Sequence, residues 1–126
     1  TLQLEPDLIR LPFEKDVARL FSASNVLVFP SIRPHFARPV IEAGAMSLPV
    51  IGSMLGGVEE LIEDGANGYL CAVNNDEAIA QKLNELFHDP DKRFQLGANG
   101  YEKALTRYSQ DVNIKQIIAI YDELAH

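Results

Sequence analysis

Glu42 is the residue whose type and position say most about chemistry. It lies about one turn into a helix that is predicted to begin at Arg38, directly after a loop at 30–37. The unpaired N–H groups and the dipole of a helix start favour an anion such as a nucleotide diphosphate. Because helical side chains lean toward the N-terminus, the Glu42 carboxylate is expected to point back toward that anion. A carboxylate there is a poor phosphate ligand but a good acceptor for ribose hydroxyls.

The segments around this loop predict a strand, loop, helix and strand in succession. Residues 26–29 form a short apolar run that ends at a proline, which favours a strand buried on both faces of a parallel sheet. The helix is predicted over 38–46, and Pro39 suits its first turn because proline has no N–H to leave unpaired. A second strand is predicted at 48–53. Ligands bind beyond the carboxyl ends of parallel strands, so the site is expected at the loop.

Gly56 and Gly57 follow the second predicted strand. Paired glycines permit positive backbone angles and a close approach of the backbone to a ligand, although the same pair also fits an ordinary turn. A short helix is predicted to begin at Val58 and would direct more N–H groups at the same crevice. The two loops are therefore expected to form one site.

The other segments complete the predicted fold. Residues 7–11 read as a strand, and 15–23 as an amphipathic helix that packs on the sheet. A turn cluster at 63–68 precedes a last strand at 69–73, in which Cys71 is predicted to fill the core. We therefore predict an α/β fold, with a partial parallel sheet over about 7–73, helices on both of its faces, and closing helices that follow.

The closing helices are predicted over about 76–125, with a break at Asp89 and Pro90. The first two carry apolar stripes that are expected to lie in the core rather than to bind a cofactor. These stripes are Ile79, Leu83, Leu86 and Phe87, then Phe94, Ala98, Tyr101 and Leu105. The third helix has Ser109 as its candidate N-cap. Its apolar face consists of Ile114, Ile117, Ile118, Tyr121 and Leu124.

Composition argues against several classes of protein. The 126 residues suffice for one domain at most, and the net charge of −7 disfavours nucleic acid as a partner. No window approaches the roughly 20 apolar residues of a membrane span, and no secretory leader is evident. A single cysteine allows no intrachain disulfide, which is compatible with the cytoplasm. Because the chain begins at Thr1 rather than Met, we expect it to be part of a longer protein.

Three linked motifs resemble one family. They are NVLVFPS at 25–31, HFARPVIEAGAMSLPVI at 35–51 and GGVEELIEDGANGYL at 56–70. Over about 16–109 the chain is similar to the second half of the nucleotide-binding domain of retaining glycosyltransferases with two facing Rossmann-like domains, the GT-B type known as glycosyl transferases group 1. Glycogen and sucrose synthases are members of this large family. The resemblance implies that residues 1–126 are a fragment of the C-terminal, donor-binding domain.

The resemblance also implies an activity for the parent protein. It would transfer a glycosyl group from a nucleoside-diphosphate sugar to an acceptor hydroxyl, with retention and without a metal or other cofactor. The acceptor site belongs to an N-terminal domain, and the basic pair that neutralises the leaving diphosphate lies upstream, so the isolated chain is expected to be inactive. The expected location is the cytoplasm, with the cytoplasmic face of a membrane as an alternative. The last helix would pack across the domain junction, so its apolar face is expected to be exposed here or to pair with another copy.

The family marks its donor site with two acidic residues that are separated by seven others. Glu42 matches the second, which holds the nucleotide ribose, whereas Pro34 stands at the first and cannot accept a hydrogen bond through its side chain. Between them the family usually has Gly-Phe-Gly, and this chain has His35, Phe36 and Ala37. The Arg38 N–H is expected to serve the distal phosphate. The loss of both glycines leaves the identity of the sugar open.

His35 would suit a general base, because histidine titrates near neutrality, but a single loop histidine without a visible partner is more often a polar contact. We expect it to bind a sugar hydroxyl or to face solvent. Glu60 matches a recurrent family glutamate, and it can equally be a structural acceptor or a solvated charge. No catalytic residue and no metal ligand are assigned. The predicted donor-binding residues are Glu42, His35, Phe36, Ala37, Arg38, Gly56, Gly57 and Glu60.

Three other functions remain compatible with the sequence. A degenerate, non-catalytic sugar-nucleotide-binding or scaffold module would explain Pro34 directly. A sugar-nucleotide epimerase shares the two-domain architecture, but the segments at 38–43 and 56–60 fit the transferases better. A response-regulator-like signalling domain is the weakest alternative, because no cluster of acidic residues ends an early strand.

Overall fold

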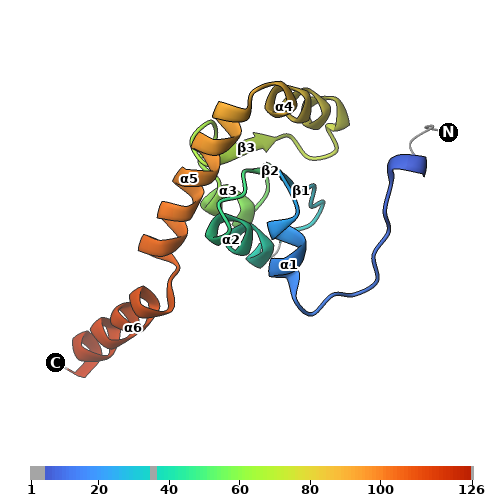
Figure 1. Cartoon of the computed structure of the whole chain (residues 1–126). Helices are drawn as coiled ribbons and strands as arrows, with labels where there is room; N and C mark the ends of the chain where they lie inside the picture. Colours follow the sequence, from blue (N-terminus) through green and yellow to red (C-terminus); the bar gives the residue numbers. More distant parts are fainter. Residues whose placement is uncertain (1–4, 35–36, 126) are drawn as a thin grey trace.

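The computed structural model describes residues 5–34 and 37–125, and its centre is a three-stranded parallel sheet (Figure 1). The strands lie in the order β1 (Leu27–Phe29), β2 (Val50–Ser53) and β3 (Gly68–Cys71). The helices are η1 (Glu5–Asp7, a 3-10 helix), α1 (Val17–Ser22), α2 (Arg38–Ala45), α3 (Gly57–Leu61), α4 (Asp76–His88), α5 (Pro90–Arg107) and α6 (Gln110–Ala125). The predicted α/β class, the parallel pairing and the closing helices are confirmed.

Helices cover both faces of the sheet, as predicted, because alternate residues of a strand point to opposite sides. Val50 belongs to the core on the side of α1, α2 and α3. Ile51, Tyr69 and Cys71 belong to the core on the other side, with Leu86 of α4. Cys71 is therefore core filler, as predicted, and its burial raises the pKa of its thiol.

β1 is less buried than the sequence predicts. All four residues of β2 are buried, whereas the three residues of β1 are only half-buried. The expectation of a strand buried on both faces is wrong for β1 in this chain. The physical reason is its position, since within the described residues β1 is an edge strand and β2 is its one partner.

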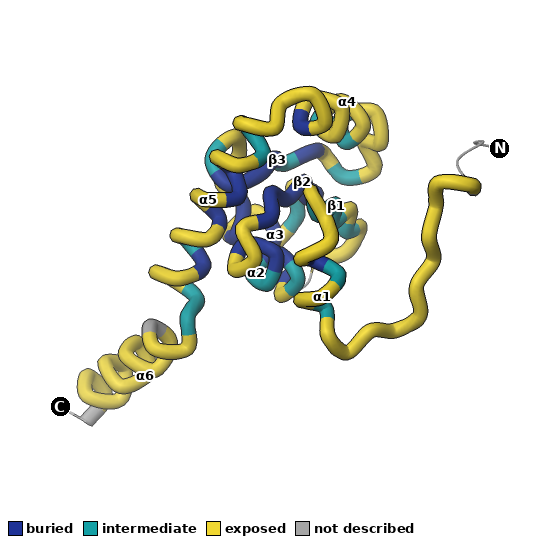
Figure 2. The backbone as a smooth tube through the Cα atoms, viewed as in Figure 1, coloured by how far each residue is buried: buried dark blue, intermediate teal, exposed yellow. Residues whose placement is uncertain are grey.

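The predicted strand at 7–11 is also wrong. η1 ends at Asp7, and the residues that follow have no strand partner. Figures 1 and 2 show this segment extending away from the sheet, exposed along its length. Ile9 is 81% exposed and Phe13 89%. An apolar run becomes a strand only where an edge is available to take its hydrogen bonds, and here the segment does not reach the sheet.

α5 buries a different face from the predicted one. Phe94, Ala98, Tyr101 and Leu105 are exposed, and Phe94 is 80% exposed. The buried residues of α5 are Leu96, Gly97, Gly100 and Ala104. A Cβ added to Gly97 would lie 2.1 Å from the carbonyl oxygen of Ser47, just after α2. These small residues let the backbone of α5 pack directly against the backbone of α2 and the residues just after it. A face of this kind carries few large apolar side chains, so hydrophobic periodicity does not detect it. On α4 the predicted stripe is core only in part, because Leu86 is buried and Phe87 is 76% exposed.

α6 lies beyond the sheet and exposes an apolar face, as expected (Figure 2). Ile117 and Ile118 are 53% and 54% exposed, and Leu124 is 79% exposed. Ser109 directly precedes α6, and its carbonyl accepts a hydrogen bond from the Asn113 N–H at 3.0 Å. Pairing of this face with another copy stays a prediction. Among the described residues, no helix is both long and apolar enough to cross a membrane.

A polar cluster ties α4 to the sheet. The Tyr69 hydroxyl donates to Glu85 Oε1 at 2.7 Å, and Lys82 Nζ lies 3.1 Å from Glu85 Oε2. Lys82 Nζ also lies 4.3 Å from the centroid of the Tyr69 ring. Burial, reinforced by the hydrogen bond to Glu85, raises the pKa of Tyr69 to about 12.

Because α5 packs closely on α2, we expect alanine substitutions at two glycines of α5 to change stability in different directions. Gly97→Ala should destabilise the chain by about 1–3 kcal/mol, because the new methyl group would clash with a backbone carbonyl. Gly100→Ala is the matched control, since its Cβ would meet nothing nearer than 3.6 Å. Alanine is also the better helix former by about 1 kcal/mol, so Gly100→Ala should be neutral or stabilising. Urea unfolding measures both variants, and equal midpoints would contradict this packing.

The raised pKa of Tyr69 predicts that the free energy of unfolding depends on pH. Its pKa is about 12 in the folded chain and 10.0 in an unfolded one, so the folded state keeps the proton longer. The stabilisation is therefore complete below pH 10 and is lost as the pH rises toward 12. The free energy of unfolding should fall by about 1 kcal/mol more in the wild type than in Tyr69→Phe between pH 9 and 11. Tyr101→Phe, a change at an exposed tyrosine, should keep the wild-type slope.

Candidate functional site

Two loops meet beyond the carboxyl ends of β1 and β2. A Cβ added to Gly56, in the loop after β2, would lie 3.0 Å from the Cβ of Pro34, in the loop after β1. Gly56 has φ 51° and ψ −124°, a backbone conformation that residues other than glycine rarely adopt. Glycine is therefore favoured at position 56 for two reasons, the positive φ and the close contact with Pro34. The prediction that these two loops adjoin is confirmed for the described residues, whereas His35 and Phe36 lie outside them.

The start of α2 lacks a side-chain cap. Its N-cap is Ala37, which is fully buried and has no side-chain oxygen, and no acidic residue stands in the first turn. The Ala37 carbonyl accepts a hydrogen bond from the Val40 N–H at 3.0 Å. Two longer helices have a side-chain cap: Asn75 accepts from the Ala78 N–H at 3.0 Å at the start of α4, and Asp89 accepts from the Lys92 N–H at 3.0 Å at the start of α5. The short helices α1 and α3 lack such a cap, as α2 does. The N-terminal end of α2 therefore keeps the electrostatic preference for an anion that such caps satisfy elsewhere.

Glu42 reaches back toward this helix start. Its Oε1 lies 2.9 Å from the Arg38 Nε, one turn earlier on α2. The direction agrees with the lean of helical side chains on which the sequence prediction relied. The Arg38 side chain is 79% exposed and that of Glu42 37%, so the ion pair itself adds little stability.

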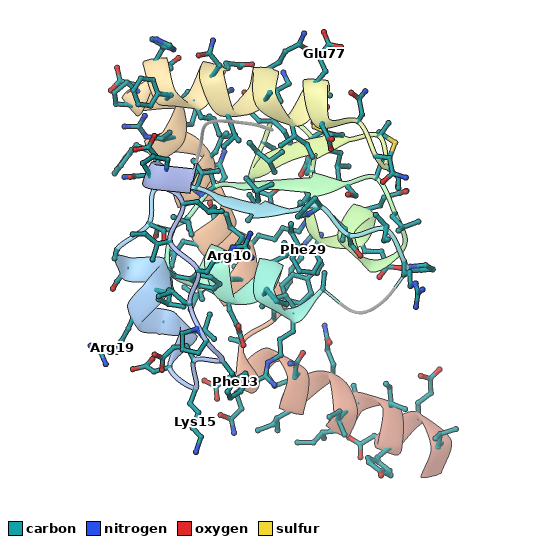
Figure 3. The ribbon with its side chains drawn as sticks, turned by 90° about the vertical axis from the view of Figure 1, so that its right-hand side faces the viewer. Arg10, Phe13, Lys15, Arg19, Phe29 and Glu77 are labelled. Carbon is teal, nitrogen blue, oxygen red and sulfur yellow. The ribbon has the colours of Figure 1, made fainter. Side chains whose placement is uncertain are left out.

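Glu42 also lines a cavity of about 340 Å³ between α1 and α2. Its walls combine apolar side chains with a few charged groups. The other lining residues are Lys15, Asp16, Val17, Ala18, Phe21, Ala45 and Met46. Lys15 lies just before α1, as Figure 3 shows. Such a cavity can take a flat heterocycle against its apolar walls while the carboxylate accepts hydrogen bonds from hydroxyls.

The contribution of α1 was not predicted, because its periodicity indicates a helix that only packs on the sheet. That packing is real, since Phe21 is buried in the core. The available signal was the pair Lys15 and Asp16, which places two charges at the start of the helix. A helix whose charged end adjoins a site can serve packing and binding together.

The structure brings some of the predicted residues together and leaves others apart. Ala37 and Arg38 form the start of α2, and Gly56 and Gly57 form the start of α3. Of the predicted donor-binding residues that the structure describes, Glu42 alone lines the cavity between α1 and α2, and Glu60 is exposed on α3. Within the described ranges, no three acidic, histidine or cysteine residues are grouped as metal ligands would be.

The chain has a Rossmann-like α/β fold, and two of its loops adjoin beyond the carboxyl ends of the strands. The sequence matches the family of glycosyl transferases group 1 over residues 2–103, and the chain belongs to this family.

Two curated relatives match almost the whole chain. The capsular polysaccharide biosynthesis glycosyltransferase CapM of Staphylococcus aureus is 26% identical over 121 residues, which are 96% of this chain and 32% of the relative. The N-acetyl-alpha-D-glucosaminyl L-malate synthase of Bacillus anthracis is 28% identical over 120 residues, 95% of this chain and 32% of the relative. The chain thus spans about a third of the length of these relatives.

Solved structures share the fold. HepE of Anabaena in complex with UDP has a TM-score of 0.85 and 27% identity, and the match covers 88% of this chain and 31% of HepE. HepE in complex with UDP-glucose gives a TM-score of 0.84 at the same 27% identity, over 90% of this chain and 31% of HepE. Both show the Rossmann-like architecture of GT-B glycosyltransferases, which confirms the predicted fold class.

Proposed function

We propose that this chain is the donor-binding part of a retaining glycosyltransferase, from the C-terminal domain of a two-domain GT-B protein. The parent protein moves a glycosyl group from a nucleoside-diphosphate sugar to an acceptor hydroxyl. Membership of the family and the likeness to structures in complex with UDP and UDP-glucose support this proposal. The observation that carries it is the Glu42 carboxylate, directed at the uncapped start of α2 on the wall of a cavity.

Each part of this site has a distinct task in binding the donor. The diphosphate lies at the start of α2, where the helix dipole and the backbone N–H groups favour negative charge. The ribose hydroxyls donate to Glu42, and the base lies against the apolar wall between α1 and α2. Gly56 and Gly57 bring the backbone of the second loop close to the donor. In the family a Gly-Phe-Gly segment meets the donor sugar, and this chain has His35, Phe36 and Ala37 in its place. The loss of the two glycines is proposed to change which sugar is accepted.

Catalysis needs more than this chain. Stabilising the departing diphosphate is an electrostatic task, and it falls to the basic pair that the family supplies from upstream. The acceptor comes from the N-terminal domain. The reaction uses no metal and no other cofactor, because positively charged side chains and helix dipoles do the work that a metal does in other transferases. The isolated chain binds the nucleotide without turning it over.

A non-catalytic sugar-nucleotide-binding module is the second candidate, and Pro34 is the observation that favours it. The proline stands where the family has its first acidic residue, and it packs against Gly56 instead of offering an oxygen to the sugar. Incubating the whole protein with a radiolabelled sugar nucleotide separates the alternatives. Transfer or hydrolysis supports the transferase, and epimerisation supports an epimerase. Binding without any reaction supports the module.

Glu42→Ala should weaken the binding of a nucleoside diphosphate by about 1–3 kcal/mol, because charge-assisted hydrogen bonds to ribose are lost. Glu42→Gln should weaken it less, since an amide oxygen still accepts one hydrogen bond. Calorimetry with UDP, GDP and ADP measures the effect whichever base the site prefers.

Glu77→Gln is the matched control for this measurement. Glu77 is exposed on α4, on the other side of the sheet from α1 (Figure 3), and it should leave the affinity unchanged. An unchanged affinity in both Glu42 variants would remove this residue from the site.

A further inference from the structure

We propose that the Arg38 side chain has two partners in turn: Glu42 when the site is empty, and the diphosphate when the nucleotide is bound. This inference rests on the proposed function and adds a role for the guanidinium group, beyond the backbone N–H of the same residue. Arg38 would thereby make the site select a nucleoside diphosphate over a nucleoside.

The position of Arg38 is electrostatically unusual. It is the first residue of α2, where the helix dipole disfavours a positive charge, and no acidic residue stands in the first turn to offset it. Its nearest compensation is the Glu42 carboxylate, 2.9 Å away and one turn later. A diphosphate at the helix start would bring negative charge to the same place and would offset both the guanidinium and the dipole.

Little free energy is needed to break the ion pair between Arg38 and Glu42 in favour of a contact with phosphate. Because the Arg38 side chain is 79% exposed, it is held by little besides Glu42, and an exposed pair of this kind is weak. Ribose hydroxyls that donate to Glu42 would share its carboxylate with the Arg38 Nε, which contacts only Oε1, and would weaken its hold on the guanidinium group. A guanidinium group released in this way has five N–H donors in a planar fork, which suits bidentate contact with a phosphate.

The residues on either side of Arg38 offer a phosphate few backbone contacts. Ala37 replaces the second family glycine, which makes a close approach of the backbone to the donor harder, and Pro39 contributes no N–H. An arginine fork can reach a phosphate that these backbone positions hold less well. Lys15 and Arg33 are the rival cations, because Lys15 lines the cavity that Glu42 lines, and Arg33 is exposed in the loop directly before Pro34. Arg93, by contrast, is engaged with the carbonyl groups of Leu86 and Phe87 on the far face of the sheet.

The test compares two ligands that differ only in the diphosphate. Calorimetry first finds which of UDP, GDP and ADP the wild type binds most tightly, and then uses that nucleotide and its nucleoside at low and high salt. Arg38→Leu should weaken diphosphate binding about tenfold, the loss of one charged contact, and leave nucleoside binding equal or tighter. The salt dependence of diphosphate binding should also fall. Arg38→Lys should be intermediate, since an ammonium group cannot fork.

Two matched variants make the result specific. Arg19→Leu removes the same charge from the exposed end of α1 (Figure 3) and should leave both affinities unchanged. Lys15→Leu should affect diphosphate binding less than Arg38→Leu, and the reverse order would assign the phosphate to Lys15 and overturn the proposal. Circular dichroism checks that each variant is folded.

The outcomes separate this inference from the proposed function. If the wild type binds nucleotide but Arg38→Leu binds the diphosphate equally well, the inference fails and the donor site stands. Equal loss for nucleoside and diphosphate would mean that Arg38 only positions Glu42, which also overturns the inference. Absence of nucleotide binding by the wild type would overturn both.

Discussion

The site depends on one constraint, which is that α2 begins without a side chain to cap it. The chain leaves β1, passes through Pro34 and enters α2 at Ala37, a buried residue that has no polar atom in its side chain. Pro39 then fixes the first turn. Pro39 has no N–H and the Val40 N–H donates to the Ala37 carbonyl, so the helix dipole and the Arg38 N–H are what favour an anion here. Glu42 is placed by the same helix, so one rigid element would set both of the proposed contacts, to the phosphate and to the ribose.

The rest of the fold holds that element in position. β2 is buried throughout and ends at the second loop, where Gly56 lies against Pro34. On its other side α2 meets α5, and Gly97 allows backbone contact with Ser47 at the end of α2. The position of α2 is therefore fixed in part by the contact at Gly97, which leaves no room for a methyl group. A site built on such an element keeps its geometry before the ligand arrives, which reduces the cost of binding.

The sequence predicts the parts of the fold that depend on local pattern. The strands at β2 and β3, the helix from Arg38 and the contact between the two loops follow from apolar runs bounded by proline and glycine. Prediction from the sequence fails where a segment's structure depends on residues far away in the chain. The run at 7–11 needs a sheet edge that it does not reach, and α5 buries glycines instead of its large side chains. In the site, the ion pair of Glu42 with Arg38 follows from helical spacing, whereas the cavity with α1 requires the packing of two helices.

A crystal structure of this chain with the nucleoside diphosphate that it binds most tightly would show whether the start of α2 and Glu42 hold the ligand. We expect the phosphate oxygens to accept a hydrogen bond from the Arg38 N–H at the start of α2, and the ribose hydroxyls to donate to the Glu42 carboxylate. A nucleotide bound at another edge of the sheet would contradict this expectation. A ribose that leaves Glu42 untouched would contradict it equally.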